Sequence, residues 1–191
     1  MMTAEEYNSR KGQTYKLLLY FGMLSMVMTF AGLTSAYVVS TSRPDWLSDF
    51  KMPAPFFVSV LLMLLSSLTI HTAKTKIKKD DRKGTTNMLL LTFLLGMCFI
   101  VSQFYGFSEI IKAGYYFTGS ESTVTTSFLY IVTILHIAHL VGGMIALLII
   151  IYNHFKQKYN STQSIGIELG AIFWHFLDIL WILLFLFFYF Y

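Results

Sequence analysis

Five long apolar blocks dominate this sequence and limit what it can fold into. They cover about residues 17–39, 55–73, 87–111, 125–152 and 167–191. A helix needs roughly 20 apolar residues to cross the hydrocarbon core of a bilayer, and each block is about that long. Only 13% of the 191 residues are charged, about half the share of a soluble domain. The sequence therefore predicts a single transmembrane domain over residues 1–191, with five spans.

The blocks predict helices rather than the strands of a membrane barrel. Hydrocarbon offers no partner for exposed backbone groups, so each span must satisfy its own hydrogen bonds. Barrel strands alternate polar and apolar side chains over segments of about ten residues. The blocks here are apolar on every face. We therefore expect an all-α integral membrane bundle.

Basic residues are distributed unevenly between the polar connections, which predicts an orientation. Eleven precede the first block or lie in the second and fourth connections: Arg10, Lys11, Lys16, Lys74, Lys76, Lys78, Lys79, Arg82, Lys83, Lys156 and Lys158. The opposite side carries three: Arg43, Lys51 and Lys112. Cytoplasmic loops carry the excess of Lys and Arg, so we expect a cytoplasmic N-terminus and a periplasmic C-terminus. No basic patch with interleaved aromatic residues indicates a nucleic-acid partner.

The last two blocks hold ionisable residues at membrane depth. Such a residue costs about 2.5–3.5 kcal/mol on insertion scales unless it is paired or hydrated. In the fifth block Glu168, His175 and Asp178 lie along one helical stripe, and the spacing of His175 and Asp178 allows a direct contact. In the fourth block His136 and His139 have the same spacing. These five residues are the candidate polar cluster.

The depths of His136 and His175 in the bilayer favour a contact between the fourth and fifth blocks. His136 lies eleven residues from Thr125, and His175 lies eight residues from Ile167 at the opposite face. At 1.5 Å per residue, both histidines are near the middle of the bilayer. We therefore expect His136 or His139 to meet His175 and Asp178 across a helix interface.

Three roles are open to such a cluster: a fastener between helices, a haem or metal site, and a proton relay. The histidines supply one axial pair for haem at most, and a relay needs a continuous chain of ionisable groups that the first three spans lack. The sequence also has no phosphate-binding glycine loop, nucleophile elbow or zinc-binding spacing. The residues alone favour a fastener, with no catalytic, cofactor-binding or metal-binding residue in this chain.

The fifth block contains the segment GIELGAIFWHFLDILW, residues 166–181. It resembles the last helix of subunit III of haem-copper oxidases, which has Gly-x-Glu followed by Trp-His-Phe-x-Asp-x-x-Trp at the same separation. The matching residues are Gly166, Glu168, Trp174, His175, Phe176, Asp178 and Trp181.

Two other blocks resemble the same family. The fourth is similar to its penultimate helix at Thr133, His136, His139 and Gly143, and the third at Gly96, Phe99 and Gln103. The chain resembles the short, five-helix form of the family. It departs from the family pattern by having no acid in the first span and by having Gly106 where an acid is common.

The resemblance implies an accessory subunit III of a cytochrome c oxidase in aerobic respiration, in the inner membrane of a bacterium. Haem and copper would belong to the partner subunits I and II, and a larger respiratory supercomplex is compatible with the role. Subunit III of the family packs beside subunit I, holds phospholipid and supports proton uptake. On this view His136, His139, Glu168, His175 and Asp178 fix the helices, and lipid or a neighbouring subunit contacts three aromatic residues: Trp174, Phe176 and Trp181.

Other functions stay open on the sequence. A subunit III of a quinol oxidase and an accessory subunit of a nitric oxide reductase share the resemblance, because nothing in the chain names the electron donor. A haem-binding membrane anchor and a small transporter are alternatives of other classes.

Overall fold

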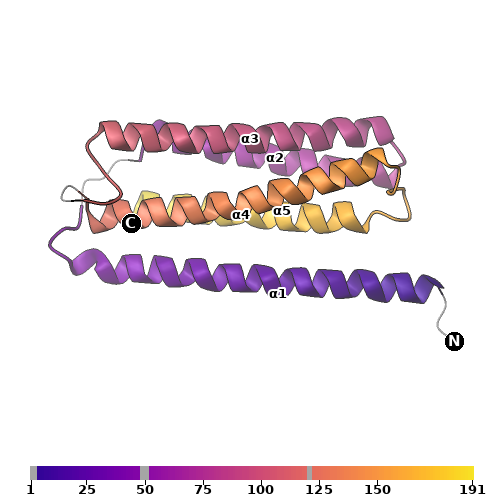
Figure 1. Cartoon of the computed structure of the whole chain (residues 1–191), viewed down its shortest axis with the longest axis horizontal. Helices are drawn as coiled ribbons and strands as arrows, with labels where there is room; N and C mark the ends of the chain where they lie inside the picture. Colours follow the sequence, from indigo (N-terminus) through magenta and orange to yellow (C-terminus); the bar gives the residue numbers. More distant parts are fainter. Residues whose placement is uncertain (1–3, 48–51, 120–121) are drawn as a thin grey trace.

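The computed structural model describes residues 4–47, 52–119 and 122–191 and is a long bundle of five helices (Figure 1). The helices are α1 (Ala4–Val39), α2 (Ala54–Lys78), α3 (Arg82–Lys112), α4 (Val124–Phe155) and α5 (Ile165–Phe190), with a short 3-10 turn, η1 (Ser40–Ser42), after α1. All five helices are long and apolar enough to cross a membrane. The predicted all-α bundle of five spans is therefore confirmed. Lys51, which entered the charge count, lies outside the described residues.

Polar caps set where α3 and α4 begin, close to the ends of the apolar blocks. Asp81 Oδ1 accepts a hydrogen bond from the backbone N–H of Gly84 at 2.9 Å. This bond and the neighbouring Lys76 ammonium lower the pKa of Asp81. At the start of α4, Thr123 and Thr126 cap each other reciprocally. Such caps satisfy backbone N–H groups that the first helical turn leaves free.

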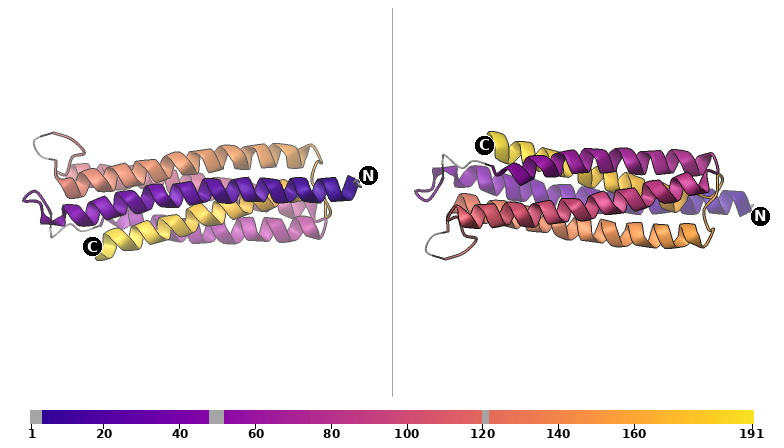
Figure 2. Two further views of the ribbon diagram at one scale, coloured as in Figure 1. Left: turned by 90° about the horizontal axis from the view of Figure 1, so that it is seen from below. Right: turned by 90° about the horizontal axis from the view of Figure 1, so that it is seen from above.

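The helices differ in how deeply they are embedded. α2 and α3 form the most extensive pair, and α5 packs against α1, α2 and α4. α1 runs along one side of the bundle and contacts α4 and α5 (Figures 1 and 2). The N-terminus and the C-terminus lie at opposite ends of the bundle, as an odd number of crossings requires (Figure 1).

α1 packs through one narrow stripe. Between residues 10 and 39 its buried or half-buried positions recur every three or four residues: Gly12, Lys16, Leu19, Met23, Met26, Phe30, Leu33, Thr34, Tyr37 and Val38. Only Phe30 and Tyr37 in this range are fully buried. Spacings of three and four residues are those of a helix that packs through one narrow face. Most of the apolar surface of α1 therefore faces outward.

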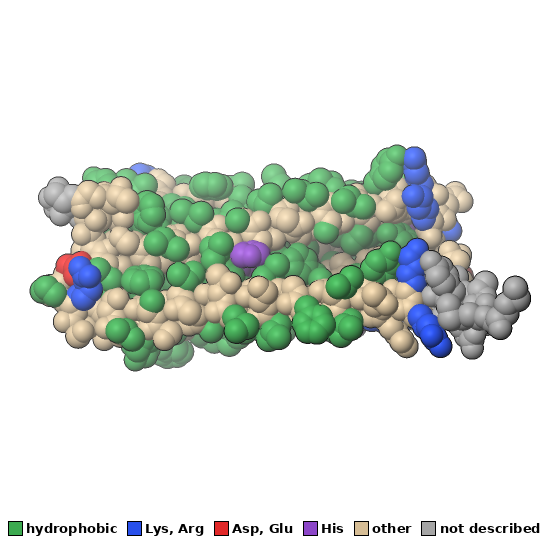
Figure 3. All heavy atoms as spheres, turned by 60° about the horizontal axis from the view of Figure 1, so that its bottom comes forward, with side chains coloured by type: hydrophobic (Ala, Val, Ile, Leu, Met, Phe, Trp, Pro, Cys, Tyr) green, Lys and Arg blue, Asp and Glu red, His purple; other side chains and the backbone are tan. Residues whose placement is uncertain are grey.

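The surface of the bundle matches a bilayer. Hydrophobic side chains cover its middle, and Lys and Arg side chains gather toward its ends (Figure 3). At the end that carries the N-terminus, the two connecting loops are joined to each other. Asp80 Oδ1 accepts from the Ser161 N–H at 2.9 Å, and Arg82 Nη2 donates to the Tyr159 carbonyl at 3.1 Å. These bonds fix the ends of four helices relative to one another.

Candidate functional site

Hydrogen bonds between buried side chains join α2 to α5 along the middle of the bundle. The indole N–H of Trp174 donates to Ser66 Oγ at 3.0 Å, and the indole N–H of Trp181 donates to Ser59 Oγ at 3.0 Å. Both serines are 0% exposed. The two serines and the two tryptophans repeat at the same seven-residue interval, so the bonds lie two turns apart on both helices. We call these four residues, together with Ser67, His175 and Asp178, the α2–α5 seam.

Each of the two buried serines also bonds to its own helix. Ser59 Oγ lies 2.6 Å from the Phe56 carbonyl, and Ser66 Oγ lies 2.9 Å from the Met63 carbonyl. A hydroxyl that donates to a carbonyl still has lone pairs, and the tryptophan N–H uses one of them. In this arrangement the serine hydroxyl and the indole N–H are both hydrogen-bonded, which an apolar membrane interior requires.

His175 and Asp178 both face α2 but contact different serines. His175 is half-buried, and its Nδ1 lies 2.7 Å from Ser67 Oγ. Asp178 is 2% exposed, and its Oδ1 lies 3.5 Å from Ser66 Oγ. Its Oδ2 has no hydrogen-bond partner among the described residues. The direct contact that the spacing of His175 and Asp178 allows is therefore not formed.

The two histidines of α4 both lie near Phe30 of α1 but differ in their other neighbours. His136 is 0% exposed, and its ring stacks on Trp181 with centroids 5.0 Å apart. His139 is half-buried, its Nδ1 donates to the Leu135 carbonyl at 2.7 Å, and its ring lies 5.6 Å from that of Phe30. His136 thus reaches α5 through an aromatic contact, whereas His139 faces α1.

Glu168 lies at the end of the bundle that carries the N-terminus. Its Oε2 is 3.1 Å from Lys16 Nζ of α1, and its Oε1 is 3.4 Å from Lys78 Nζ of α2. Glu168 therefore joins three helices through ion pairs, away from His175 and Asp178. Of the five residues predicted as one cluster, His175 and Asp178 lie together beside adjacent serines of α2. His136, His139 and Glu168 make other contacts.

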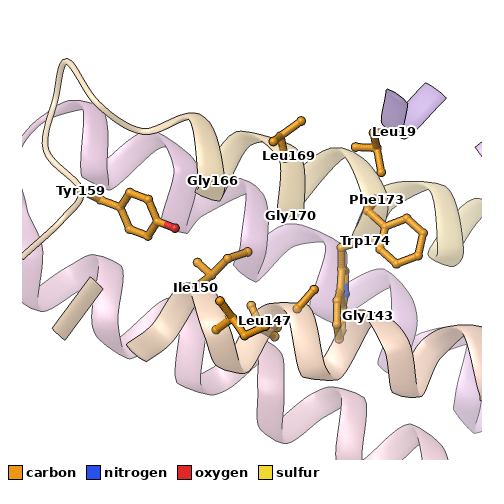
Figure 4. Close-up of a pocket in the computed structure, with 12 residues that line it drawn as sticks. Leu19, Gly143, Leu147, Ile150, Tyr159, Gly166, Leu169, Gly170, Phe173 and Trp174 are labelled. Atoms are coloured by element: carbon orange, nitrogen blue, oxygen red, sulfur yellow. The ribbon is translucent and has the colours of Figure 1, made fainter. Parts of the chain in front are cut away.

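An apolar cavity of about 310 Å³ lies between α1, α4 and α5. In Figure 4, Tyr159 lies at one end, and Phe173 and Trp174 lie at the other. Gly170 lets Ile150 of α4 lie directly against the backbone of α5. A Cβ at this position would collide with Ile150 Cδ1. The cavity is lined almost entirely by apolar side chains.

The three aromatic residues predicted to contact lipid or a neighbouring subunit lie in different environments. Trp174 is 1% exposed but lines the 310 Å³ cavity. Phe176 is half-buried and lines a second apolar cavity, of about 350 Å³, between α1 and α5. Trp181 is 3% exposed and packs among Phe56, Phe99 and His136 inside the bundle.

Sequence reasoning missed several polar residues in the core. The hydroxyl partners of the seam were not singled out, although Ser59 and Ser66 repeat at seven residues in an otherwise apolar span. Gln103 was named only for its resemblance to the family, without a role; it is 0% exposed, and neither polar atom of its amide has a hydrogen-bond partner among the described residues. Each of these residues is polar and lies within an apolar span, and this alone indicates a buried polar contact.

The contacts described for these residues join one helix to another. Within the part of the chain that the structure describes, no group of three or more His, Cys, Asp or Glu residues could hold a metal ion. The imidazole of His175 is engaged by Ser67, and that of His136 is packed flat against an indole.

The sequence matches, over residues 3–191, the family described as "Cytochrome c oxidase subunit III". The chain belongs to the cytochrome c oxidase subunit III family. It is 30% identical over 167 residues to "Cytochrome c oxidase subunit 3" of Thermostichus vulcanus, covering 85% of this chain and 80% of the relative. It is 29% identical over 170 residues to the protein of the same name from Corynebacterium diphtheriae, covering 86% and 82%.

A similar likeness is found in "Probable cytochrome c oxidase subunit 3" of Mycobacterium leprae, 29% identical over 164 residues, which cover 84% of this chain and 80% of the relative. The resemblance expected from residues 166–181 is thus confirmed along nearly the whole chain. Its helices and its relatives make it a multi-pass bacterial membrane protein. Membership of the subunit III family implies a complex with other oxidase subunits.

Proposed function

We propose that this chain is the accessory third subunit of a haem-copper terminal oxidase in aerobic respiration, with no redox centre of its own. The α2–α5 seam carries this proposal. Its indoles and the His175 imidazole are engaged by serines of the same chain, so they act as fasteners between helices. Haem and copper then belong to subunits I and II, and this chain supplies a rigid surface beside subunit I.

We propose further that the chain holds phospholipid. The 310 Å³ cavity is apolar and lies between α1 and two other helices, where an acyl chain can enter from the bilayer. Trp174 and Phe173 at its inner end supply flat apolar surfaces against which a hydrocarbon chain packs (Figure 4). Lipid held here would stabilise the contact of α1 with the bundle.

The proposed contribution to catalysis is indirect. By keeping subunit I in place, the chain would support its proton uptake and its durability during turnover. The basic residues gathered at the end that carries the N-terminus support placing that end in the cytoplasm, the side from which protons are taken up.

The test is to purify the native complex through an affinity tag on this chain. We expect a haem- and copper-containing subunit to co-purify, with cytochrome c as the electron donor. Turnover with a quinol in place of cytochrome c would identify a quinol oxidase. Reduction of nitric oxide would identify a nitric oxide reductase, of which this chain would be an accessory subunit. A chain that is isolated without partners in mild detergent would contradict the proposal. A Soret band in that isolated chain would instead support a haem-binding anchor.

A further inference from the structure

Two polar side chains in the core have no hydrogen-bonding partner among the described residues. They are Gln103 of α3 and His136 of α4, and both are 0% exposed. Neither the amide atoms of Gln103 nor the two ring nitrogens of His136 are engaged. Buried polar atoms in folded proteins are hydrogen-bonded to protein or to ordered water in the great majority of cases. Four such atoms in the middle of a membrane bundle therefore require a partner.

Contacts of α3 place Gln103 beside the beginning of α2. Ser102 Oγ donates to the Pro55 carbonyl at 2.8 Å, and a Cβ on Gly106 would lie 2.6 Å from Phe56 Cε2. Gln103 lies between these two anchor points on α3.

Contacts with α4 place Gln103 in the layer next to His136. The Phe99 ring is 5.8 Å from that of His136, and the Phe107 ring is 5.0 Å from that of Tyr130. Gln103 is one helical turn from both phenylalanines, so it occupies the level between these two ring contacts. Gln103 and His136 thus belong to adjacent levels of the same α3–α4 interface.

The aromatic neighbours of His136 keep its ring in the core. Trp181 stacks on one face at 5.0 Å, and Phe99 and Phe30 approach at interplanar angles of 72° and 66°. The ring cannot turn toward the lipid without losing these contacts, so a partner for its nitrogens must come to the core. A neutral imidazole and a primary amide each offer donors and acceptors.

We propose that Gln103 and His136 bind ordered water between α3 and α4. A buried water molecule typically makes about three hydrogen bonds to otherwise unsatisfied groups. These two side chains supply both hydrogen-bond donors and hydrogen-bond acceptors. The site is closed, because both residues are 0% exposed, which suits a ligand as small as water. The water takes the place of a direct hydrogen bond, which these two side chains do not make, and it links the third and fourth spans.

A map of the intact oxidase complex at about 2 Å resolution tests the site directly. We expect density about 2.7–3.2 Å from the Gln103 amide and from a ring nitrogen of His136. A direct bond between the two side chains, or a dry interface with new protein partners, would overturn the proposal.

Variants test the same site without a map. In a double-mutant cycle with Gln103→Leu and His136→Leu, each single change should lower the temperature at which the chain leaves the complex by about 2–4 °C. The double variant should lose little more than one single variant, because both partners of the shared water are then gone. Asn87→Leu, the same change at an exposed position of α3, is the control and should cause no shift. Additive losses would show that the two residues share no ligand.

Discussion

Lys16 of α1 and Glu168 of α5 form an ion pair with 3.1 Å between Nζ and Oε2, although 152 residues separate them in the sequence. Because α1 otherwise packs through a narrow apolar stripe, this pair fixes one end of a loosely embedded helix. Lys78 adds a third helix to the contact through the other carboxylate oxygen.

Removing the charge of Glu168 should loosen α1 slightly. The lysines are 38% and 52% exposed, so the loss in Glu168→Gln should stay below about 1 kcal/mol. Salt screens exposed pairs, and the difference from the wild type should vanish at about 1 M NaCl. Thermal unfolding of the complex at low and high salt measures both effects. Glu109→Gln removes the same charge from a residue that has no ion pair within the described part of the chain, and it should change nothing. An equal loss there would refute the role of Glu168.

Removing the acceptor of an indole in the α2–α5 seam should destabilise the bundle. Ser59→Ala leaves the Trp181 N–H buried without its partner, which costs about 1–3 kcal/mol in proteins generally. Hydrogen bonds between membrane helices average about 0.6 kcal/mol, so we expect a loss toward the lower end of that range. Denaturation in mixed detergent measures it. Ser25→Ala, at an exposed position of α1, should be neutral; similar losses in both variants would contradict the seam.

Changing the carboxyl group of Asp178 to an amide should weaken assembly. Asp178→Asn keeps the shape of the side chain but replaces a carboxyl oxygen that has no hydrogen-bond partner among the described residues by an NH₂ group, and an unpaired buried donor is costly. We expect a lower unfolding temperature and a smaller fraction of oxidase that retains this chain. Asp45, a partly exposed residue after η1 whose Oδ1 accepts from Arg43 Nε and would remain as the amide oxygen, is changed to Asn as the control. Unchanged stability and assembly in Asp178→Asn would mean that this carboxyl group does not fasten α5.

Filling the cavity between α1, α4 and α5 should displace lipid. Ala146 lines this cavity, and Ala146→Phe places a ring in the space available to an acyl chain. We expect fewer phospholipid molecules per complex by mass spectrometry. Ala138→Phe introduces the same ring at an exposed position of α4 and should retain the lipid. Equal lipid content in all three proteins would exclude the cavity as a binding site.

The cap of α3 should respond to acid. The Gly84 N–H and the Lys76 ammonium lower the pKa of Asp81 from its ordinary value of 3.8. Because the folded pKa is the lower one, the stabilisation is complete above the ordinary value and is lost as the pH falls through the folded value. Amide exchange of the first turn of α3, corrected for intrinsic rates, should therefore accelerate below about pH 4. Asp81→Asn retains a capping oxygen without a charge, so its protection should not change over that range.

The five spans were predictable because the bilayer leaves few alternatives. Block length and the need for internal backbone bonds predict that these segments are helices, but helices 54–78 and 82–112 each extend five residues beyond the apolar block toward the connection between them. The directions of side chains were not predictable in this way. The spacing of His175 and Asp178 permits a contact, but two adjacent serines of another helix determine where each side chain points.

Glu168 illustrates the same limit at the membrane surface. Its position on the stripe with His175 suggested a shared cluster, yet two lysines from distant segments reach it first. Long lysine side chains extend toward the aqueous ends of a span, and their targets depend on how α1 and α2 are placed around α5. Helix periodicity describes one helix at a time and therefore cannot supply this information.

The narrow stripe of α1 also bears on how the chain is made. The helices that α1 contacts, α4 and α5, are synthesised after α2 and α3. During biogenesis α1 must therefore reside in the lipid, or be shielded by an insertase, until α5 has been made. A premature stop before residue 165 would leave α1 without the ion pair and without its contacts to α5, as a substrate for membrane quality control.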